Sequence, residues 1–182
     1  MNKLVFIFIS LFILNGCKEE TLPKPPAYLR LDFEDNGYEK HESNCYHFEK
    51  NNASNIKKEK DCNLELHYPK QKATIYLTYR PVVKNINILL SDAQKLTYEH
   101  VIKADEIEER PYINKNRKVY GMFYNVTGNA ATNTQFYITD STKHFMVGSL
   151  YFYAKPNYDS IFPAIEFIKK DMVKIMESTQ WQ

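Results

Sequence analysis

The stretch Val119–Tyr153, VYGMFYNVTGNAATNTQFYITDSTKHFMVGSLYFY, contains three β-rich runs separated by two short polar runs. The β-rich runs are Val119–Val126, Thr134–Thr139 and Phe145–Tyr153, and they are rich in the aromatic and β-branched residues that strands favour. The polar runs, GNAATN at 128–133 and DSTK at 140–143, consist of residues typical of turns. This order predicts three consecutive strands in an antiparallel meander.

A second group of strands is predicted ahead of the meander. Leu64–Tyr68 and Ala73–Tyr79 each alternate apolar and polar residues, which places one side of each strand against a core. The run Tyr68–Lys72, with Pro69 inside it, supplies a turn, so the two strands are expected to form a hairpin.

Weaker signals lie nearer the N-terminus. Leu29–Phe33 alternates apolar and charged residues and is predicted to form the first strand. Cys45–Phe48 is predicted to form a short strand. Asn51–Asp61 is polar, charged and free of proline, and we expect it to be an exposed loop.

The pattern changes to a helical one across Asn85–Lys103. Asn85, or alternatively Ser91, supplies the N-cap. Apolar or partly apolar residues then recur at spacings of three and four, at Leu89, Ala93, Leu96, His100 and Ala104. The acidic run Asp105–Glu109 would be unfavourable at the negative C-terminal end of a helix. We therefore expect an exposed acidic turn or a short helix there, ending before Pro111.

A second helix is predicted at the end of the chain. Asp159 and Ser160 are candidate caps, and Pro163 falls in the first turn. The stripe expected to be buried consists of Ile161, Ile165, Ile168, Met172 and Ile175. The order of strands, helix, strands and helix predicts an α+β fold: an antiparallel sheet of about six to seven strands with two main helices packed on it, forming one globular domain over residues 28–182.

The chain opens with the features of a lipoprotein signal. Lys3 precedes the apolar run Leu4–Leu14, whose 11 residues suit a secretory signal and are fewer than the ~20 needed to span a bilayer. Gly16 and Cys17 follow, so residues 1–16 are expected to be removed and Cys17 to receive fatty acyl chains such as palmitate. Several chains give a stable anchor, whereas one gives only a marginal one. The alternatives are an ordinary secretory signal cleaved nearby and an uncleaved anchor.

Export of the chain determines the interpretation of the remaining features. Residues 17–27 would form a lipidated N-terminus and a proline-rich tether that reaches under ~30 Å, which holds the domain close to the membrane. Of the three cysteines, Cys45 and Cys62 remain after Cys17 is lipidated. In an oxidising compartment this pair is predicted to form a disulfide, and the alternative is two free thiols.

Composition and motifs argue against several functions. Without Lys3 the chain has 23 basic and 22 acidic residues, which gives no electrostatic reason to expect a nucleic-acid partner. The five histidines show no metal-ligand spacing, and neither a phosphate-binding loop nor a nucleophile elbow occurs. Asp140, Ser141 and His144 lie close in sequence, but a short turn offers neither an oriented base nor an oxyanion hole. We therefore predict no enzyme, no metal site and no cofactor.

Longer segments resemble a known family. They include HYPKQKATIYLTY at 67–79, KADEIEE at 103–109 and GNAATNTQFYITDSTKHFMVGSLYF at 128–152, followed by the last helix. Over nearly all of Pro23–Trp181 the chain is similar to the gliding motility lipoprotein GldD family of Bacteroidetes. The resemblance implies a non-enzymatic envelope lipoprotein required for gliding motility and for the linked type IX secretion machinery. It transfers one functional residue, Cys17, as the lipidated cysteine.

Three further sequence features fit a Bacteroidetes protein. Lys18-Glu19-Glu20 resembles the signal that sends some lipoproteins of these bacteria to the cell surface, and the alternative is a solvated linker. Ser141 and Ser160 lie in Asp-Ser triplets that match their O-glycosylation pattern, and the alternatives are a hairpin turn and a helix cap. We expect a lipid-anchored envelope protein at the outer membrane in preference to the inner membrane. The domain could face either the periplasm or the cell surface.

Two functions from different classes follow. The first is an assembly component that binds proteins of the gliding and type IX apparatus through the meander and its loops, with candidate residues Asn129, Thr132, Asn133, Asp140 and Lys143. The second is a glycan- or peptidoglycan-binding lipoprotein that uses exposed tyrosines, of which the chain has 14, as stacking platforms. The two differ in whether several tyrosines share one exposed face.

Overall fold

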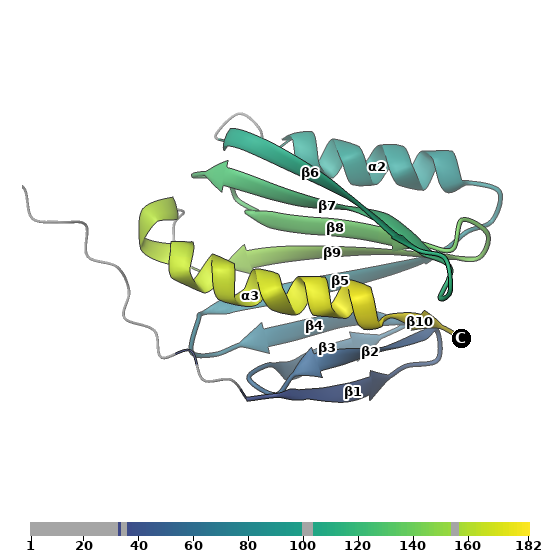
Figure 1. The fold of residues 1–182 in the computed structure, drawn as a ribbon, viewed down its shortest axis with the longest axis horizontal. Helices are drawn as coiled ribbons and strands as arrows, with labels where there is room; N and C mark the ends of the chain where they lie inside the picture. Colours follow the sequence, from purple (N-terminus) through teal and green to yellow (C-terminus); the bar gives the residue numbers. More distant parts are fainter. Residues whose placement is uncertain (1–32, 34–35, 100–103, 154–156) are drawn as a thin grey trace, which may run out of the picture.

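A computed structural model describes Phe33 and residues 36–99, 104–153 and 157–182 (Figure 1). The strands are β1 (Tyr38–Glu42), β2 (Tyr46–Asn51), β3 (Asn55–Lys60), β4 (Asn63–Tyr68), β5 (Ala73–Pro81), β6 (Ala104–Asn114), β7 (Val119–Gly128), β8 (Thr134–Thr139), β9 (His144–Phe152) and β10 (Gln180–Trp181). The helices are α2 (Ile86–Glu99) and α3 (Tyr158–Ser178). The predicted signal and tether over residues 1–27, and the predicted strand Leu29–Phe33 apart from Phe33 itself, lie outside the described residues.

The strands form two antiparallel sheets. The larger has seven strands in the order β3-β4-β5-β9-β8-β7-β6, and the smaller has three in the order β1-β2-β10. The predicted hairpin is confirmed as β4 and β5, and the predicted meander is confirmed as β7, β8 and β9. An α+β fold is therefore confirmed, although the sequence predicted one sheet and the small second sheet was missed.

One face of the large sheet, which we call the inner face, is apolar and packs against α3. Ile75, Leu77, Met146, Leu150, Phe136 and Ile138 on this face are all at most 1 % exposed. Gly148 lies directly opposite Phe136, and a Cβ there would approach the Phe136 ring to 2.3 Å. The absence of a side chain at this position therefore lets the ring lie across β9, which closes the core.

The predicted stripe of α3 is confirmed as the cover of the inner face. All five of its residues are buried: Ile161, Ile165, Ile168, Met172 and Ile175. The helix begins two to three residues earlier than expected, with Asn157 as the N-cap in place of Asp159 or Ser160. Pro163 is therefore the sixth residue of the helix and not in its first turn as predicted, and it has no N–H to donate to the carbonyl oxygen of Asp159.

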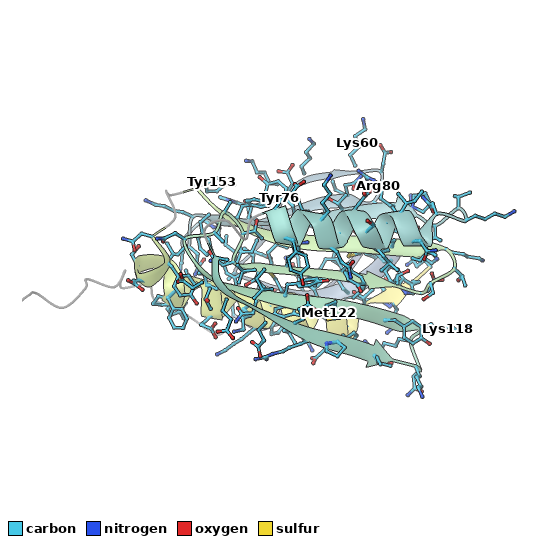
Figure 2. All side chains as sticks on the ribbon, turned by 90° about the horizontal axis from the view of Figure 1, so that it is seen from above. Lys60, Tyr76, Arg80, Lys118, Met122 and Tyr153 are labelled. Atoms are coloured by element: carbon cyan, nitrogen blue, oxygen red, sulfur yellow. A yellow bond between two sulfur atoms is a disulfide. The ribbon has the colours of Figure 1, made fainter. Side chains whose placement is uncertain are left out.

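Helix α2 lies on the opposite face of the large sheet, which we call the outer face (Figures 1 and 2). Only Ala93 and Thr97 of this helix are buried, while Leu89 and Leu96 of the predicted stripe are half-buried. Below the helix, Gln135 Nε2 donates hydrogen bonds to the Ala93 carbonyl oxygen at 3.1 Å and to Thr97 Oγ1 at 2.8 Å. Helix α2 is therefore held by small side chains and polar contacts. His100 and the predicted end of the helix lie outside the described residues.

Two predicted loops are strands in the structure, and both lie at edges of the large sheet. Asn55–Lys60, within the predicted exposed loop Asn51–Asp61, is edge strand β3, and it is fully exposed. Asp105–Glu109, predicted as an acidic turn or short helix, belongs to edge strand β6, whose free edge also accommodates Pro111. Charged residues and proline commonly protect edge strands against pairing with another chain. Because loops have a similar composition, these two strands were predicted as loops.

Cys45 and Cys62 form the disulfide that the cysteine count predicted, with their Cα atoms 6.1 Å apart. Cys45 directly precedes β2 of the small sheet, and Cys62 lies in the turn between β3 and β4 of the large sheet. The bond therefore ties the two sheets together. The strand predicted at Cys45–Phe48 is β2, which begins one residue later and continues to Asn51.

Candidate interaction surfaces

Three tyrosines share the outer face beside α2. Tyr76 on β5 and Tyr151 on β9 are half-buried, with ring centroids 5.7 Å apart in an edge-to-face arrangement. Tyr153, just beyond β9, is 54 % exposed, and its hydroxyl lies 2.5 Å from Thr74 Oγ1. These rings are held in place by their neighbours and still present faces to solvent, as an aromatic stacking platform requires.

Three lysines of β3 lie beside these tyrosines. The pairing of β3 with β4 shifts between Ile56 and Lys58, so Lys57 forms a β-bulge. Lys57 Nζ lies 5.9 Å from the centroid of the Tyr153 ring, on the outer face. Lys58 and Lys60 pair with Glu65 and Asn63, on the same face of the sheet. The bulge therefore adds a third cation to the two that strict alternation would provide.

Tyr76, Tyr151, Lys58 and Lys60 line a continuous depression, which we call the outer-face groove, whereas Lys57 and Tyr153 contact each other outside its lining. A hollow of about 240 Å³ between β3, β4 and β5 adjoins one of about 450 Å³ between α2, β5 and β9, and both are lined by Tyr76, Thr78 and Arg80. Figure 2 shows Lys60, Tyr76, Arg80 and Tyr153 on one side of α2 and Met122 on the other. The groove is open along its length, which suits an extended ligand better than a small molecule.

Cations outnumber anions in the groove. Lys58, Lys60 and Arg80 line it, against the carboxylates Glu65 and Asp92. Lys58 Nζ lies 4.0 Å from Glu65 and its side chain is 68 % exposed, so this ion pair leaves the ammonium available to a ligand. Burial raises the pKa of Tyr76, and the neighbouring Tyr153 and Glu65 raise it further, so its phenol stays protonated and remains a donor at neutral pH.

The two predicted interaction loops lie at opposite ends of β8, which separates them by six residues of strand, or ~20 Å. In the first loop, Thr132 and Asn133 are each only 2 % exposed. Asn133 Nδ2 donates to the carbonyl oxygens of Val126 and Gly128, at 3.1 and 3.0 Å, which closes the turn. Asn129 is exposed, and its Oδ1 accepts the N–H of Tyr158. The two loops therefore lie apart, and Thr132 and Asn133 are buried in the first of them, where Asn133 has a structural role.

The second loop is organised by Asp140. Its Oδ1 accepts the backbone N–H groups of Thr142, Lys143 and His144, at 2.9, 2.8 and 2.8 Å. Partial burial opposes ionisation of this carboxyl, but the hydrogen bonds to its charged form outweigh that effect and lower its pKa to about 2. The carboxylate of Asp140 therefore holds the turn together through these hydrogen bonds, whereas the side chain of Lys143 is exposed.

A separate hollow of about 500 Å³ lies at the end of the sheet that carries the β8–β9 turn, and we call it the far-end hollow. Lys118 and Lys143 line it together with His144 and Trp181, whose rings stack with centroids 5.1 Å apart and an interplanar angle of 9°. The Tyr79 hydroxyl lies 2.9 Å from His144 Nδ1. Partial burial lowers the pKa of His144, so the imidazole is neutral at pH 7 and the lysines supply the positive charge.

The described residues contain no arrangement suited to catalysis. His144 Nδ1 contacts Tyr79 and not Asp140, whose oxygens bind the turn, so these residues do not form a triad with Ser141. Over the same residues, no three histidine, cysteine or acidic side chains gather into a group able to hold a metal ion. His67 lies beside Tyr153 on the outer face. Its Nδ1 is 3.3 Å from Thr74 Oγ1 and 3.4 Å from the Tyr153 hydroxyl.

The predicted modification sites differ in their accessibility. Ser141 is exposed at the tip of its turn, with a φ of 67°. Ser160 is half-buried, and its hydroxyl donates to the carbonyl oxygen of Asn157 at 2.9 Å, in the first turn of α3. Cys17, the predicted lipidation site, lies outside the described residues. Among the described helices, none is long and apolar enough to cross a bilayer.

Comparison with known proteins assigns the family. The family model described as "Gliding motility lipoprotein GldD" matches residues 18–181 and therefore covers every described helix and strand. No curated protein matches the chain. Membership of a lipoprotein family implies a lipid-anchored protein of the cell envelope. The chain belongs to the gliding motility lipoprotein GldD family.

Proposed function

We propose that this protein is a non-enzymatic assembly component, required for gliding motility and for the linked type IX secretion machinery, that binds partner proteins of that apparatus. The observation that carries the proposal is the family match over residues 18–181, which spans both sheets and both helices. Residues 28–182 act as a single domain, lipidated Cys17 anchors it, and residues 17–27 tether it at the outer membrane.

The far-end hollow is the surface that best suits a protein partner. Tyr38, where β1 begins, pairs with Asn51 at one end of β2, whereas β10 pairs with Tyr46 at the other end. The hollow therefore lies at the opposite end of the molecule from the start of β1 (Figure 1). A domain anchored through its N-terminus can present this end, with Lys118 and Lys143, away from the anchor.

Crosslinking in native membranes tests this proposal. The wild-type protein should recover components of the gliding and secretion machinery, and a Lys118→Glu/Lys143→Glu variant should lose them because both cations reverse sign. Lys170→Glu/Lys72→Glu, which changes two exposed lysines away from the hollow, is the matched control. Loss of gliding and secretion in the first variant alone supports the proposal. Recovery of the same partners by both variants contradicts the assignment of this surface.

Glycan binding is the second candidate function, and one observation favours it. Tyr46, Tyr68 and Tyr124 are buried in the protein, but Tyr76, Tyr151 and Tyr153 gather on one accessible face. Retention of the purified domain on peptidoglycan in the absence of other proteins supports this function. A protein that is recovered only with protein partners, and passes through a peptidoglycan column, excludes it.

The proposed anchor and modifications have direct tests. Metabolic labelling with a fatty acid should mark the wild-type protein and not a Cys17→Ala variant, and a labelled variant would contradict lipidation at this residue. Glycosylation at Ser141 or Ser160 should add mass beyond that of the lipidated polypeptide, and an intact mass equal to the unmodified form rules it out. Separation of the inner and outer membranes should place the labelled protein in the outer membrane.

A further inference from the structure

We infer that the outer-face groove binds an acidic glycan, a polysaccharide strand whose sugars carry carboxylates. The inference rests on the second function proposed above and adds the site and the charge of the ligand. The groove brings together cations from β3 and β5 with the tyrosine rings of β5 and β9, and both sets face the same open depression.

The charge of the groove selects for an anion. Lys57, Lys58 and Lys60 are three of the four residues at 57–60 and lie on one face because of the bulge, and Arg80 extends the row onto β5. Carboxylate-bearing sugars placed along the groove would meet several ammonium groups in succession. The mature chain as a whole is close to neutral, so this concentration of cations is local to the groove.

The tyrosines select for a ligand with flat apolar faces. The C–H faces of a sugar ring can stack on an aromatic ring, while the sugar hydroxyls bond to polar groups at its edge. Tyr76 and Tyr151 support each other edge to face, and Tyr153 is fixed by its contact with Thr74, so the platform loses little conformational freedom on binding. Thr78 adds a hydroxyl at the floor of the groove.

The geometry disfavours an extended peptide in the same place. Strands β5 and β9, which form the floor of the groove, each have a hydrogen-bonded strand on both sides. The floor therefore offers side chains and no free backbone edge to which a strand could add. The groove is also not an apolar cleft of the kind that receives the buried side of an amphipathic helix. An acidic peptide would use the lysines but leave the tyrosine faces without a partner.

Binding to polygalacturonate and to its methyl ester tests the inference, because the two polymers share one sugar and differ in charge. Measured with the whole lipid-free domain, polygalacturonate should bind and the ester should bind at least ~10-fold more weakly. A Lys58→Ala/Lys60→Ala variant should lose about 10-fold in affinity for the acidic polymer, with the loss shrinking at high salt. Tyr153→Ala should weaken binding of both polymers by ~5-fold through loss of stacking.

Two controls separate binding from folding. Lys115→Ala/Lys170→Ala removes two exposed lysines outside the groove and should leave affinity unchanged. Glu65→Gln removes a carboxylate that lines the groove and should tighten binding of polygalacturonate by ~3-fold, a gain that a misfolded variant cannot give.

The binding results distinguish an acidic glycan from a neutral glycan, an acidic peptide and a nucleic acid. Equal binding of the acid and the ester overturns the acidic-glycan inference but leaves glycan binding standing. If neither polymer binds and peptidoglycan is also not retained, both proposals fail. Tighter binding of polyglutamate or oligothymidylate than of polygalacturonate overturns the inference in favour of an acidic peptide or a nucleic acid.

Discussion

The two faces of the large sheet differ in what covers them. On the inner face α3 buries nine of its residues, between the large sheet and β2 of the small sheet. On the outer face α2 buries only Ala93 and Thr97, and Leu89 and Leu96 remain half-buried beside a groove. Both helices have similar apolar spacing in sequence. Helix α3 therefore completes the core, whereas α2 forms one wall of the outer-face groove.

The side chains of the strands follow the same division. On β5, Ile75 and Leu77 are buried on the inner face, while Tyr76 and Thr78 on the outer face are half-buried. Alternation along one strand therefore places core residues on one side and groove-lining residues on the other. Substitutions on the two faces should differ in the same way: inner-face changes should act on folding, and outer-face changes on binding.

Truncation of the inner face should have the largest effect. Ile168→Ala removes a fully buried side chain from α3, so it should lower the free energy of unfolding by ~2–5 kcal/mol through lost burial and a cavity. Leu96→Ala, the matched truncation on half-buried α2, should cost about 1 kcal/mol because less apolar surface leaves water when the protein folds. Denaturant titration of both variants measures the difference, and equal losses would contradict the comparison.

Loss of the disulfide should come next. Cys45→Ser/Cys62→Ser opens a loop with a sequence separation of 17, so unfolding should become ~3 kcal/mol easier on the chain-entropy model. Denaturant midpoints with and without a reductant measure the effect. A wild-type midpoint that does not respond to the reductant would contradict it.

Weakening the attachment of α2 to the sheet should have a smaller effect on stability, confined to that helix. Gln135→Ala removes the donor to Ala93 and Thr97 and should cost ~1–2 kcal/mol. Hydrogen exchange should then accelerate in α2 more than in α3, because only the outer helix loses its polar contact. Uniform acceleration across both helices would mean that α2 is not separately held.

The smallest effect concerns Asp140, in the turn between β8 and β9. Its pKa is lowered from 3.8 to about 2 in the folded protein, so its stabilising contribution is complete above pH ~4 and is lost as the pH falls toward 2. Partial exposure reduces this contribution to about 1 kcal/mol. Asp140→Asn should flatten the change in stability between pH 4 and pH 2, measured by thermal unfolding, and an unchanged slope would contradict the assigned cause.

The sequence predicted those parts of the fold in which one local pattern determines the structure. GNAATN and DSTK separated β7, β8 and β9, and the alternation around Pro69 defined β4 and β5. Strands β3 and β6 were missed because their charged residues suit an exposed edge, and only pairing with β4 and β7 distinguishes them from loops. The small sheet was missed because β10 is only two residues long and pairs with a strand distant in sequence.

The candidate surfaces were harder to predict. The abundance of tyrosine indicated a contact surface, but the accessible ones could not be distinguished from buried Tyr46 or Tyr68 without the sheet register. The lysines of β3 lay in a segment interpreted as a loop, and the bulge that aligns them depends on pairing with β4. The candidate residues of the loops at 128–133 and 140–143 lie at opposite ends of β8, and their burial, such as that of Thr132 and Asn133, could not be predicted from the sequence.

A hydrogen-exchange footprint of the domain with and without polygalacturonate tests the binding role of the outer face most directly. Binding in the groove should slow exchange in β3, β4 and α2, which surround it, and leave α3 on the inner face unchanged. Protection confined to α3, or to the β6–β7 and β8–β9 turns at the far-end hollow, would contradict the assignment of the outer face as the glycan-binding surface.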